Sequence, residues 1–342
     1  MTSPGNPVPL PDERALIRHL RGRLPRPPSF LHIGPGDDAA VIVPERGAFQ
    51  VLTTDALVEG VHFDRRWSSL ADIGHKALAV NLSDLAAMGA APSHALLSLV
   101  LPAGTSLNDL DALLDGFLEL ASAQKVTLAG GNLSRSPGPL MVDVTAAGHV
   151  RPRRILARSG GRPGHALYVT GSIGGAAAGL GLLQSRRPTP RPESLDPQTA
   201  AIVQRHLRPE PRTRIGMLVG RNRAASACID LSDGLADAVQ QLAEASGAGA
   251  VIDAGALPID AAARRWFEEQ GLDPIQAALA GGDDFELLFA IPRKRGGRLR
   301  SVQREARGVP LTRIGEMTTA DRGVRLLREG VEVPLTGGFS HF

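Results

Sequence analysis

Acidic side chains set among small and apolar neighbours are the residues of this chain best suited to chemistry. Asp55 follows two threonines at the end of an apolar run, Asp38 lies in the turn Gly36–Ala39, and Asp84 stands among alanines and leucines. Buried carboxylates are costly without a positive partner, and the chain has only three lysines. Oxygen ligands from Asp and Thr suit Mg²⁺, which a few carboxylates and substrate phosphates commonly hold. The pattern therefore favours a magnesium–nucleotide site.

Two further acidic motifs lie in the second half of the chain. Ile229–Gly234 places two carboxylates and a hydroxyl where a strand is expected to give way to a helix, so that a ligand there would meet backbone N–H groups. Gly281–Glu286 has the same character. The sequence Leu-Ser-Asp occurs at 82–84 and again at 231–233, which we interpret as reuse of one turn chemistry rather than as duplication.

Each acidic motif also has a structural interpretation. Asp38 can bond the backbone of its own turn, the Thr53–Asp55 segment can cap a helix or turn, and Ser232 or Asp233 can be an N-cap. Asp84 in mid-helix is harder to explain in this way and favours a metal or a buried partner. The Walker loop, the protein-kinase motifs, His-Glu-x-x-His, Cys-x-x-Cys and Gly-x-Ser-x-Gly are absent from the sequence.

Composition excludes several function classes. The net charge is only +3, aromatic residues make up 4%, and no basic run is interleaved with aromatics, so nucleic-acid binding is not expected. No apolar run approaches the roughly 18 residues of a membrane span, and no signal peptide is recognisable. The single cysteine, Cys228, cannot form an internal disulfide, which fits a reducing compartment. We expect a cytoplasmic protein.

The elements that must position these residues alternate between strands and helices, which predicts an α/β or α+β fold. The 342 residues suggest two domains. We expect a leader over 1–30, an N-terminal domain over 31–150 and a C-terminal domain over 151–342, with the Arg/Pro/Gly-rich segment 151–164 at the boundary.

The first half predicts helices over 13–20, 72–88 and 108–123 and strands over 39–43, 49–53, 94–101, 126–131 and 140–150. The strands at 39–43 and 49–53 are expected to form a hairpin, Asn108 is expected to cap its helix, and the outward acids Asp111, Asp115 and Glu119 to be solvated. The second half predicts helices over 174–183, 199–207, 212–219, 235–246, 261–270 and 297–306, strands over 166–170, 225–230, 250–253, 285–291 and 309–315, and a hairpin over 324–333.

Taken in order, the motifs resemble the thiamine-monophosphate kinase family, of the superfamily that includes aminoimidazole ribonucleotide synthetase and selenophosphate synthetase. His62 and the terminal His-Phe favour the thiamine branch. The matching stretches run from about residue 33 to the end of the chain: Gly36–Ala40, Thr54–Phe63, Lys76–Ala90, Leu156–Gly160, His206–Pro209, Ile229–Leu235, Gly281–Phe289 and Gly338–Phe342.

The resemblance implies ATP-dependent phosphorylation of thiamine monophosphate to thiamine diphosphate in a homodimer. Its fold would be a two-domain α/β (α+β) kinase, with an N-terminal mixed sheet that pairs across the dimer and a C-terminal α/β domain. The implied catalytic residues are Asp55, Asp84 and Asp230. The implied Mg²⁺ ligands are Asp38, Thr53, Thr54, Asp55, Asp84, Asn132, Asp230 and Asp233. The implied ATP contacts are Gly131, Asn132, Arg158 and Ser232, and the implied substrate contacts are His62, Asp283 and Phe339.

Two positions depart from the family pattern. Asn132 stands where the family usually has Asp, which keeps an oxygen ligand but loses a charge, and Asp283 stands where Glu is common. One alternative is a related ATP-dependent synthetase, which the lack of a cysteine near the N-terminus disfavours. The other is a nucleotide-binding regulator with weakened catalysis, which Asn132 motivates.

Overall fold

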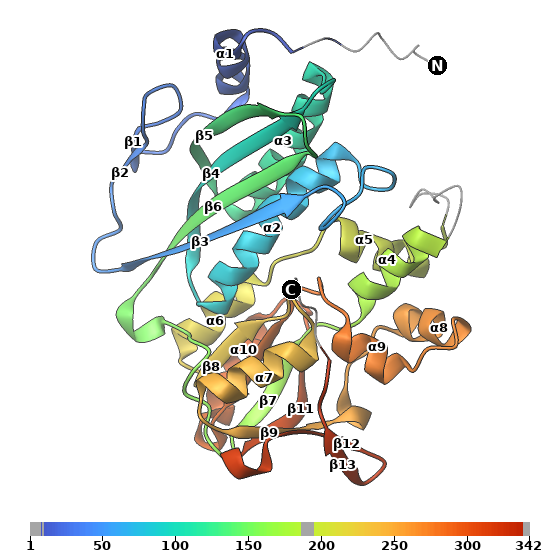
Figure 1. Cartoon of the computed structure of the whole chain (residues 1–342). Coiled ribbons are helices and arrows are strands. Elements are labelled where there is room, and N and C mark those ends of the chain that lie inside the picture. Colours follow the sequence, from blue (N-terminus) through green and yellow to red (C-terminus); the bar gives the residue numbers. More distant parts are fainter. Residues whose placement is uncertain (1–7, 9, 186–194, 338–342) are drawn as a thin grey trace. The chain divides into compact units, whose positions relative to one another are not determined.

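The computed structural model describes residues 8, 10–185 and 195–337, which form two compact units (Figure 1). The first unit comprises Met1–Asn81 and Pro92–His149, and the second comprises Leu82–Ala91 and Val150–Phe342. Helix α2, Leu70–Ala87, begins in the first unit and ends in the second. The last turns of α2, with Ser83 and Asp84, therefore belong with the second unit.

The first unit is built on a four-stranded sheet in the order β3-β6-β4-β5. Its strands are β3 Phe49–Val58, β4 Ala91–Pro102, β5 Thr127–Ser136 and β6 Met141–Val150. Burial alternates along β4 and β6, as expected for a sheet with one covered face. Helix α3, Leu107–Gln124, packs beside α2 and buries Phe117 and four of its leucines, Leu110, Leu113, Leu114 and Leu120.

Helices α2 and α3 pack at backbone contact through a pair of glycines. A Cβ atom on Gly74 would lie 1.9 Å from the carbonyl oxygen of Leu113, and one on Gly116 would lie 1.8 Å from that of Ala71. No side chain fits either gap, so both positions require glycine for close approach rather than for backbone freedom.

The N-terminal helix α1, Glu13–Arg23, is fixed to α3 by charge pairs. His19 Nε2 lies 2.7 Å and Arg23 lies 2.6 Å from Asp111 Oδ1, and Arg23 also pairs with Asp115. Asp115 and Glu119 are exposed, as expected for a solvated face, but Asp111 is half-buried against α1, which its spacing in the sequence could not reveal.

Two local expectations are corrected in this unit. The N-cap of α3 is Ser106, whose side chain forms a capping box with Asp109, and not Asn108. The strand β2, Val41–Ile42, pairs with β1, Leu31–Ile33, while β3 joins the sheet, so the predicted hairpin does not form.

The second unit contains a seven-stranded sheet in the order β13-β12-β9-β11-β7-β10-β8, mostly antiparallel. Its strands are β7 Ala166–Thr170, β8 Ala227–Asp230, β9 Gly249–Asp253, β10 Leu287–Ile291, β11 Leu311–Thr318, β12 Val324–Arg328 and β13 Val331–Pro334. Its helices are α4 Gly175–Ser185, α5 Pro197–Leu207, α6 Thr213–Asn222, α7 Leu235–Ala245, α8 Ala261–Glu269, α9 Pro274–Ala280 and α10 Gly296–Glu305.

Helices cover both faces of this sheet. Residues of α4, α5 and α7 to α9 pack with Leu167 and Ile229 in one core, while α6, α10 and the end of α2 pack with Cys228 and Phe289 in another. Because side chains alternate along a strand, Asp230 shares the face of Cys228. The seven-residue helix α9 is absent from the sequence-based expectations because it is too short to show a clear period.

Within the described residues, no helix is both long enough and apolar enough to cross a membrane.

The glycine contact between α2 and α3 gives a test of this packing. We predict that Gly116→Ala lowers the free energy of unfolding by roughly 2 kcal/mol or more, because overpacking outweighs the gain of about 1 kcal/mol in helix propensity. Gly22→Ala in α1, where a Cβ would meet nothing within 4 Å, is the matched control. Urea denaturation is the measurement, and equal stability of the two variants would contradict the packing.

Candidate functional site

Asp230 is the acidic residue whose surroundings are most unusual. It is the last residue of β8, it is 4% exposed, and its Oδ2 accepts a hydrogen bond of 2.8 Å from the Ser83 hydroxyl on α2. Asp84, the next residue of that helix, is half-buried and close enough to act on Asp230 by charge. The Leu-Ser-Asp motif at 82–84 therefore contacts the Asp-Leu-Ser-Asp motif at 230–233 within the second unit.

The charge balance around Asp230 disfavours its ionised form. Burial, and then the negative charge of Asp84, raise the pKa of the Asp230 carboxyl to about 7. The Ser83 hydrogen bond and the charge of Arg158 act in the opposite direction. Arg158 is itself exposed and donates from Nη1 to Gln241 Oε1 at 2.6 Å. The charge of Arg158 therefore offsets the raised pKa of Asp230 only in part.

The segments 231–234 and 281–286 extend the antiparallel pairing of β8 and β10. Leu231 N donates to the Glu286 carbonyl at 2.9 Å, Phe285 N to the Leu231 carbonyl at 2.9 Å, and Asp283 N to the Ser232 carbonyl at 2.7 Å. The pairing brings Ser232, Asp233 and Asp283 to one end of the two strands. Both acidic motifs of the second half are thus parts of one structural element.

Neither Ser232 nor Asp233 caps the following helix. The N-cap of α7 is Gly234, with φ of 97° and no side-chain cap, and a Cβ there would lie 2.9 to 3.0 Å from three carbonyl oxygens of residues 279–281. The capping interpretation is therefore wrong. Ser232 is exposed and Asp233 is half-buried.

In the first unit, the predicted ligands on β3 point to opposite faces of the strand. Thr53 and Asp55 are half-buried on the side of buried Leu57, whereas the exposed Thr54 points to the other side. The Thr54 hydroxyl lies 3.3 Å from the Val144 carbonyl and 3.2 Å from the Thr145 hydroxyl. The strand therefore brings the side chains of Thr53 and Asp55 together and excludes that of Thr54.

Gly131 and Asn132 lie on β5, at the opposite edge of the same sheet from β3. Three strand spacings put the two edges about 14 Å apart, so this unit does not bring Asn132 beside Asp55. Asn132 is exposed and its amide donates to Ser134 Oγ at 3.1 Å. Gly131 also has a structural reason to be glycine, because a Cβ there would lie 1.9 Å from the Leu97 carbonyl oxygen.

His62 and Asp38 both take part in turns. The ring Nδ1 of His62 accepts a hydrogen bond of 3.1 Å from Val58 N, and its carbonyl oxygen accepts one of 3.3 Å from Lys76. Asp38 is exposed, and its backbone N donates to Asp37 Oδ1 at 3.0 Å, so the side chain that bonds the turn backbone is that of Asp37. Phe339 lies outside the described residues.

A buried charge network, not expected from the sequence, is centred on Glu286 at the end of the 281–286 segment. Glu286 is fully buried and receives Arg212 at 2.7 Å on each carboxylate oxygen, together with the Thr170 hydroxyl at 2.5 Å. Burial alone would lower the pKa of the Arg212 guanidinium, but the hydrogen bonds and charge of Glu286 raise that pKa above its usual value. Arg205 adds contacts to Glu286 at 3.3 Å and to Asp284 at 3.6 Å.

The donor set fits a divalent cation in part. Among the described residues, no group of three or more His, Cys, Asp or Glu side chains is arranged to hold an ion. Asp84 and Asp230 nevertheless present two mutually repelling carboxylates beside the Ser83 hydroxyl, all oxygen donors. Mg²⁺ is commonly held by one or two carboxylates, with waters and substrate phosphates completing its shell. The arrangement suits that mode rather than an all-protein cage.

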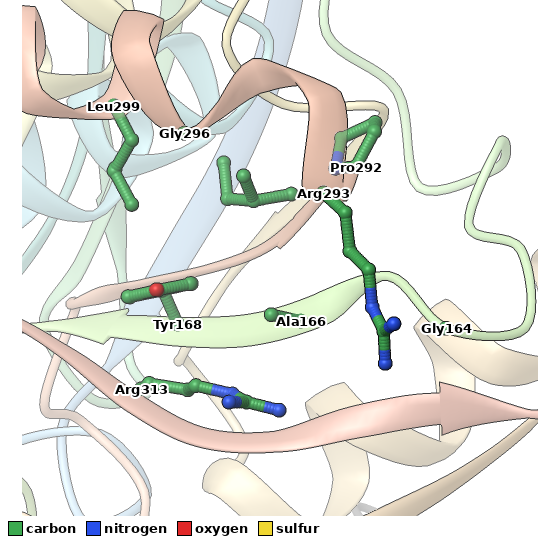
Figure 2. A pocket seen from close by; sticks show the side chains of 9 residues that line it. Gly164, Ala166, Tyr168, Pro292, Arg293, Gly296, Leu299 and Arg313 are labelled. Carbon is green, nitrogen blue, oxygen red and sulfur yellow. The ribbon is translucent and has the colours of Figure 1, made fainter.

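A cavity of about 290 Å³ in the second unit lies away from these residues. Figure 2 shows Tyr168 on β7 with Arg293 and Arg313 among the side chains that line this cavity. None of the predicted site residues lines it. Its two arginines are exposed and it contains no buried polar group, so nothing marks it as a ligand site.

Family models, curated relatives and solved structures all resemble this chain over most of its length. Models described as AIR synthase related protein, N-terminal domain and C-terminal domain, match residues 36–150 and 162–327. The thiamine-monophosphate kinase of Escherichia coli O157:H7 is 41% identical over 315 residues, 91% of this chain and 92% of that protein. The crystal structure of thiamine-monophosphate kinase from Stenotrophomonas maltophilia is 36% identical with a TM-score of 0.80, covering 94% and 98%. The structure of AaThiL complexed with AMPPCP and TMP is 31% identical with a TM-score of 0.76, covering 96% and 95%.

The raised pKa of Asp230 predicts a pH-dependent effect of Asp230→Asn on the metal-free protein. A carboxyl whose pKa rises from 3.8 to about 7 on folding contributes stability below pH 3.8 that is lost as the pH rises through 7. Asparagine does not titrate. From pH 4 to pH 8 in EDTA, the wild type should therefore lose stability relative to the variant, by on the order of 3 kcal/mol.

Urea denaturation at the two pH values measures this difference. Asp321→Asn, at an exposed position, is the control and should show no such change. Parallel pH profiles for wild type and Asp230→Asn would contradict the burial of an ionisable Asp230.

Proposed function

Because this chain belongs to the thiamine-monophosphate kinase family, it phosphorylates thiamine monophosphate to thiamine diphosphate with ATP, and we propose that it does so by direct in-line transfer at a magnesium site. The family, the kinase activity and the two-domain α/β fold that the sequence predicted are confirmed by the relatives. The magnesium site, its residues and the homodimer are the proposed part.

The chemistry of the acceptor determines what the site must supply. Thiamine monophosphate already offers a phosphate oxygen as nucleophile, so the reaction needs no strong general base. The difficulty lies in bringing two anions together, in line with the bond that breaks. Positioning and charge neutralisation should therefore account for most of the rate enhancement. A site rich in carboxylates and poor in lysine matches that need.

The carboxylate pair in the second unit is the observation that carries the proposal. Asp84 and Asp230 repel each other in a buried setting, with Ser83 donating to Asp230 at 2.8 Å. Asp84, Asp230 and the neighbouring Asp233 would be the metal ligands that the second unit provides. When bound, Mg²⁺ would neutralise charge on the phosphates of ATP and of the acceptor. Arg158 and Ser232, both exposed at this end of the strands, would contact ATP.

The first unit would contribute ligands from two strands and a turn. Asp55 and Thr53 share a face of β3 and are proposed as ligands, together with Asp38. Thr54 would take part through its backbone only, because its hydroxyl is bonded to β6. Gly131 and Asn132 on β5 are proposed nucleotide contacts, with Asn132 also a metal ligand.

Three residues are proposed to contact thiamine monophosphate. His62 presents its ring at a turn that Val58 N holds by a hydrogen bond to Nδ1. The Asp283 side chain is 36% exposed, which leaves a carboxylate available to a cationic thiamine ring. Phe339 is the third, as the resemblance implies.

Pairing of two copies is proposed through the open face of the first unit's sheet. Leu52 on β3 is 64% exposed and Leu96 on β4 is 41% exposed, both on strand positions that alternate with buried residues. A solvated sheet face is normally polar, so exposed leucines on two strands of this face favour a partner that covers them. Strand β3 is moreover an edge of the sheet, so a homodimer would cover both features.

The magnesium assignment predicts that Asp84→Asn lowers kcat/KM by roughly a hundredfold or more, because it removes a charged ligand from the reacting phosphates. Formation of thiamine diphosphate from ATP, Mg²⁺ and thiamine monophosphate is the measurement, and EDTA should stop it. Glu305→Gln, which breaks an exposed ion pair with Arg221, is the control and should keep full activity. An Asp84→Asn variant as active as the control would rule out the assignment.

The substitution Asn132→Asp tests the departure from the family pattern. Restoring a charged ligand should lower the Mg²⁺ concentration for half-maximal rate by about three- to tenfold. Ser136→Asp adds the same charge further along β5 and should leave that concentration unchanged. If both variants behave alike, Asn132 does not bind metal.

A further inference from the structure

The segment that carries Asp283 has an unusual backbone. Asp283 has φ of 66° and Phe285 has φ of 49°, so two residues other than glycine lie in the left-handed region on either side of buried Asp284. Such conformations cost of order 1 kcal/mol each and persist where the surroundings enforce them. The hydrogen bonds of Asp283 N and Phe285 N to the 231–232 carbonyls fix this backbone.

The C-terminal end of α5 holds the same segment by its side chains. Arg205 contacts Glu286 at 3.3 Å and Asp284 at 3.6 Å, and donates to the Ser172 hydroxyl at 2.7 Å and the Ser172 carbonyl at 2.5 Å. His206, the next residue, is 4% exposed, and its Nδ1 lies 3.5 Å from Asp283 Oδ2, an ion-pair contact that carries charge when the imidazole is protonated. One end of a helix thus contacts all three acids of the segment.

The contacts divide into two kinds. Those of Arg205 reach carboxylates that are themselves buried and hold the segment in place. The contact of His206 reaches a carboxylate that is 36% exposed, on a residue whose backbone is already fixed by Ser232. His206 therefore adds little to the course of the chain, and acts on the direction in which the Asp283 carboxylate points.

We propose that His206 is a positioning residue for substrate binding, which holds the Asp283 carboxylate in the orientation that receives the cationic ring of thiamine monophosphate. The inference rests on the proposed role of Asp283 as a substrate contact. An unheld carboxylate would lose rotamer freedom when substrate binds, and prior orientation removes that cost. His206 opens the motif His206-Leu-Arg-Pro209, which no proposed metal or ATP contact uses, and the proposal gives this one residue of the motif a role.

Two polar variants separate positioning from packing. The amide nitrogen of asparagine falls near the place of Nδ1 of histidine, whereas that of glutamine falls near Nε2. His206→Asn should therefore keep the KM for thiamine monophosphate within about twofold of wild type, and His206→Gln should raise it by about tenfold. The KM for ATP should stay within about twofold in both.

A double-mutant cycle and a stability control complete the test. Asp283→Asn tolerates the left-handed backbone and should itself raise the KM for thiamine monophosphate, after which His206→Gln should add no further increase. Val203→Ala, at a fully buried position of the same helix, should lower the melting temperature without changing either KM.

The outcomes distinguish this inference from the function it rests on. If Asp283→Asn raises the KM but His206→Gln does not, or if His206→Gln has the same effect without the Asp283 carboxylate, the positioning role is overturned and the substrate contact stands. An unchanged KM in Asp283→Asn would overturn the substrate contact and the positioning role together.

Discussion

The electrostatic repulsion between Asp84 and Asp230 is the constraint on which the proposed site in the second unit depends. Folding carries Asp230 from water to a position 4% exposed at the end of β8, and the residue that approaches it is another acid. The free energy of such a pair is recovered only by a cation, a proton or removal of one carboxylate. The chain offers Ser83 and the exposed Arg158, which stabilise the carboxylate only in part. In the proposed function, a bound divalent ion would complete this balance.

A buried charge network holds this end of the sheet in place. Glu286 sits fully buried between Arg212 and Thr170, directly before β10, which pairs with β8. Removing one partner of a buried charge pair typically costs about 3 to 5 kcal/mol, so the 281–286 segment is strongly held. The carboxylates that remain accessible, such as that of Asp283, are thereby presented from a fixed backbone, as phosphoryl transfer by positioning requires.

The candidate acidic residues could be recognised from the sequence, but the tertiary contacts that hold them could not. Small and apolar neighbours made Asp55, Asp84, Asp230 and Asp283 conspicuous as candidate site residues, and the roles assigned to them stay proposals. Ser83 was missed although it lies in a repeated Leu-Ser-Asp, since only folding shows that its hydroxyl meets Asp230. The partners of Asp111 and Glu286 were equally out of reach, because each is distant in sequence. Gly131 illustrates the converse, a motif glycine with a steric reason of its own.

The most direct test is a crystal structure of the protein with Mg²⁺, a non-hydrolysable ATP analogue and thiamine monophosphate. The account predicts an ion about 2.1 Å from carboxylate oxygens of both Asp84 and Asp230, with phosphate oxygens and water completing its shell. Ions held only by phosphates and water, with Asp230 bonded to Ser83 alone, would contradict it.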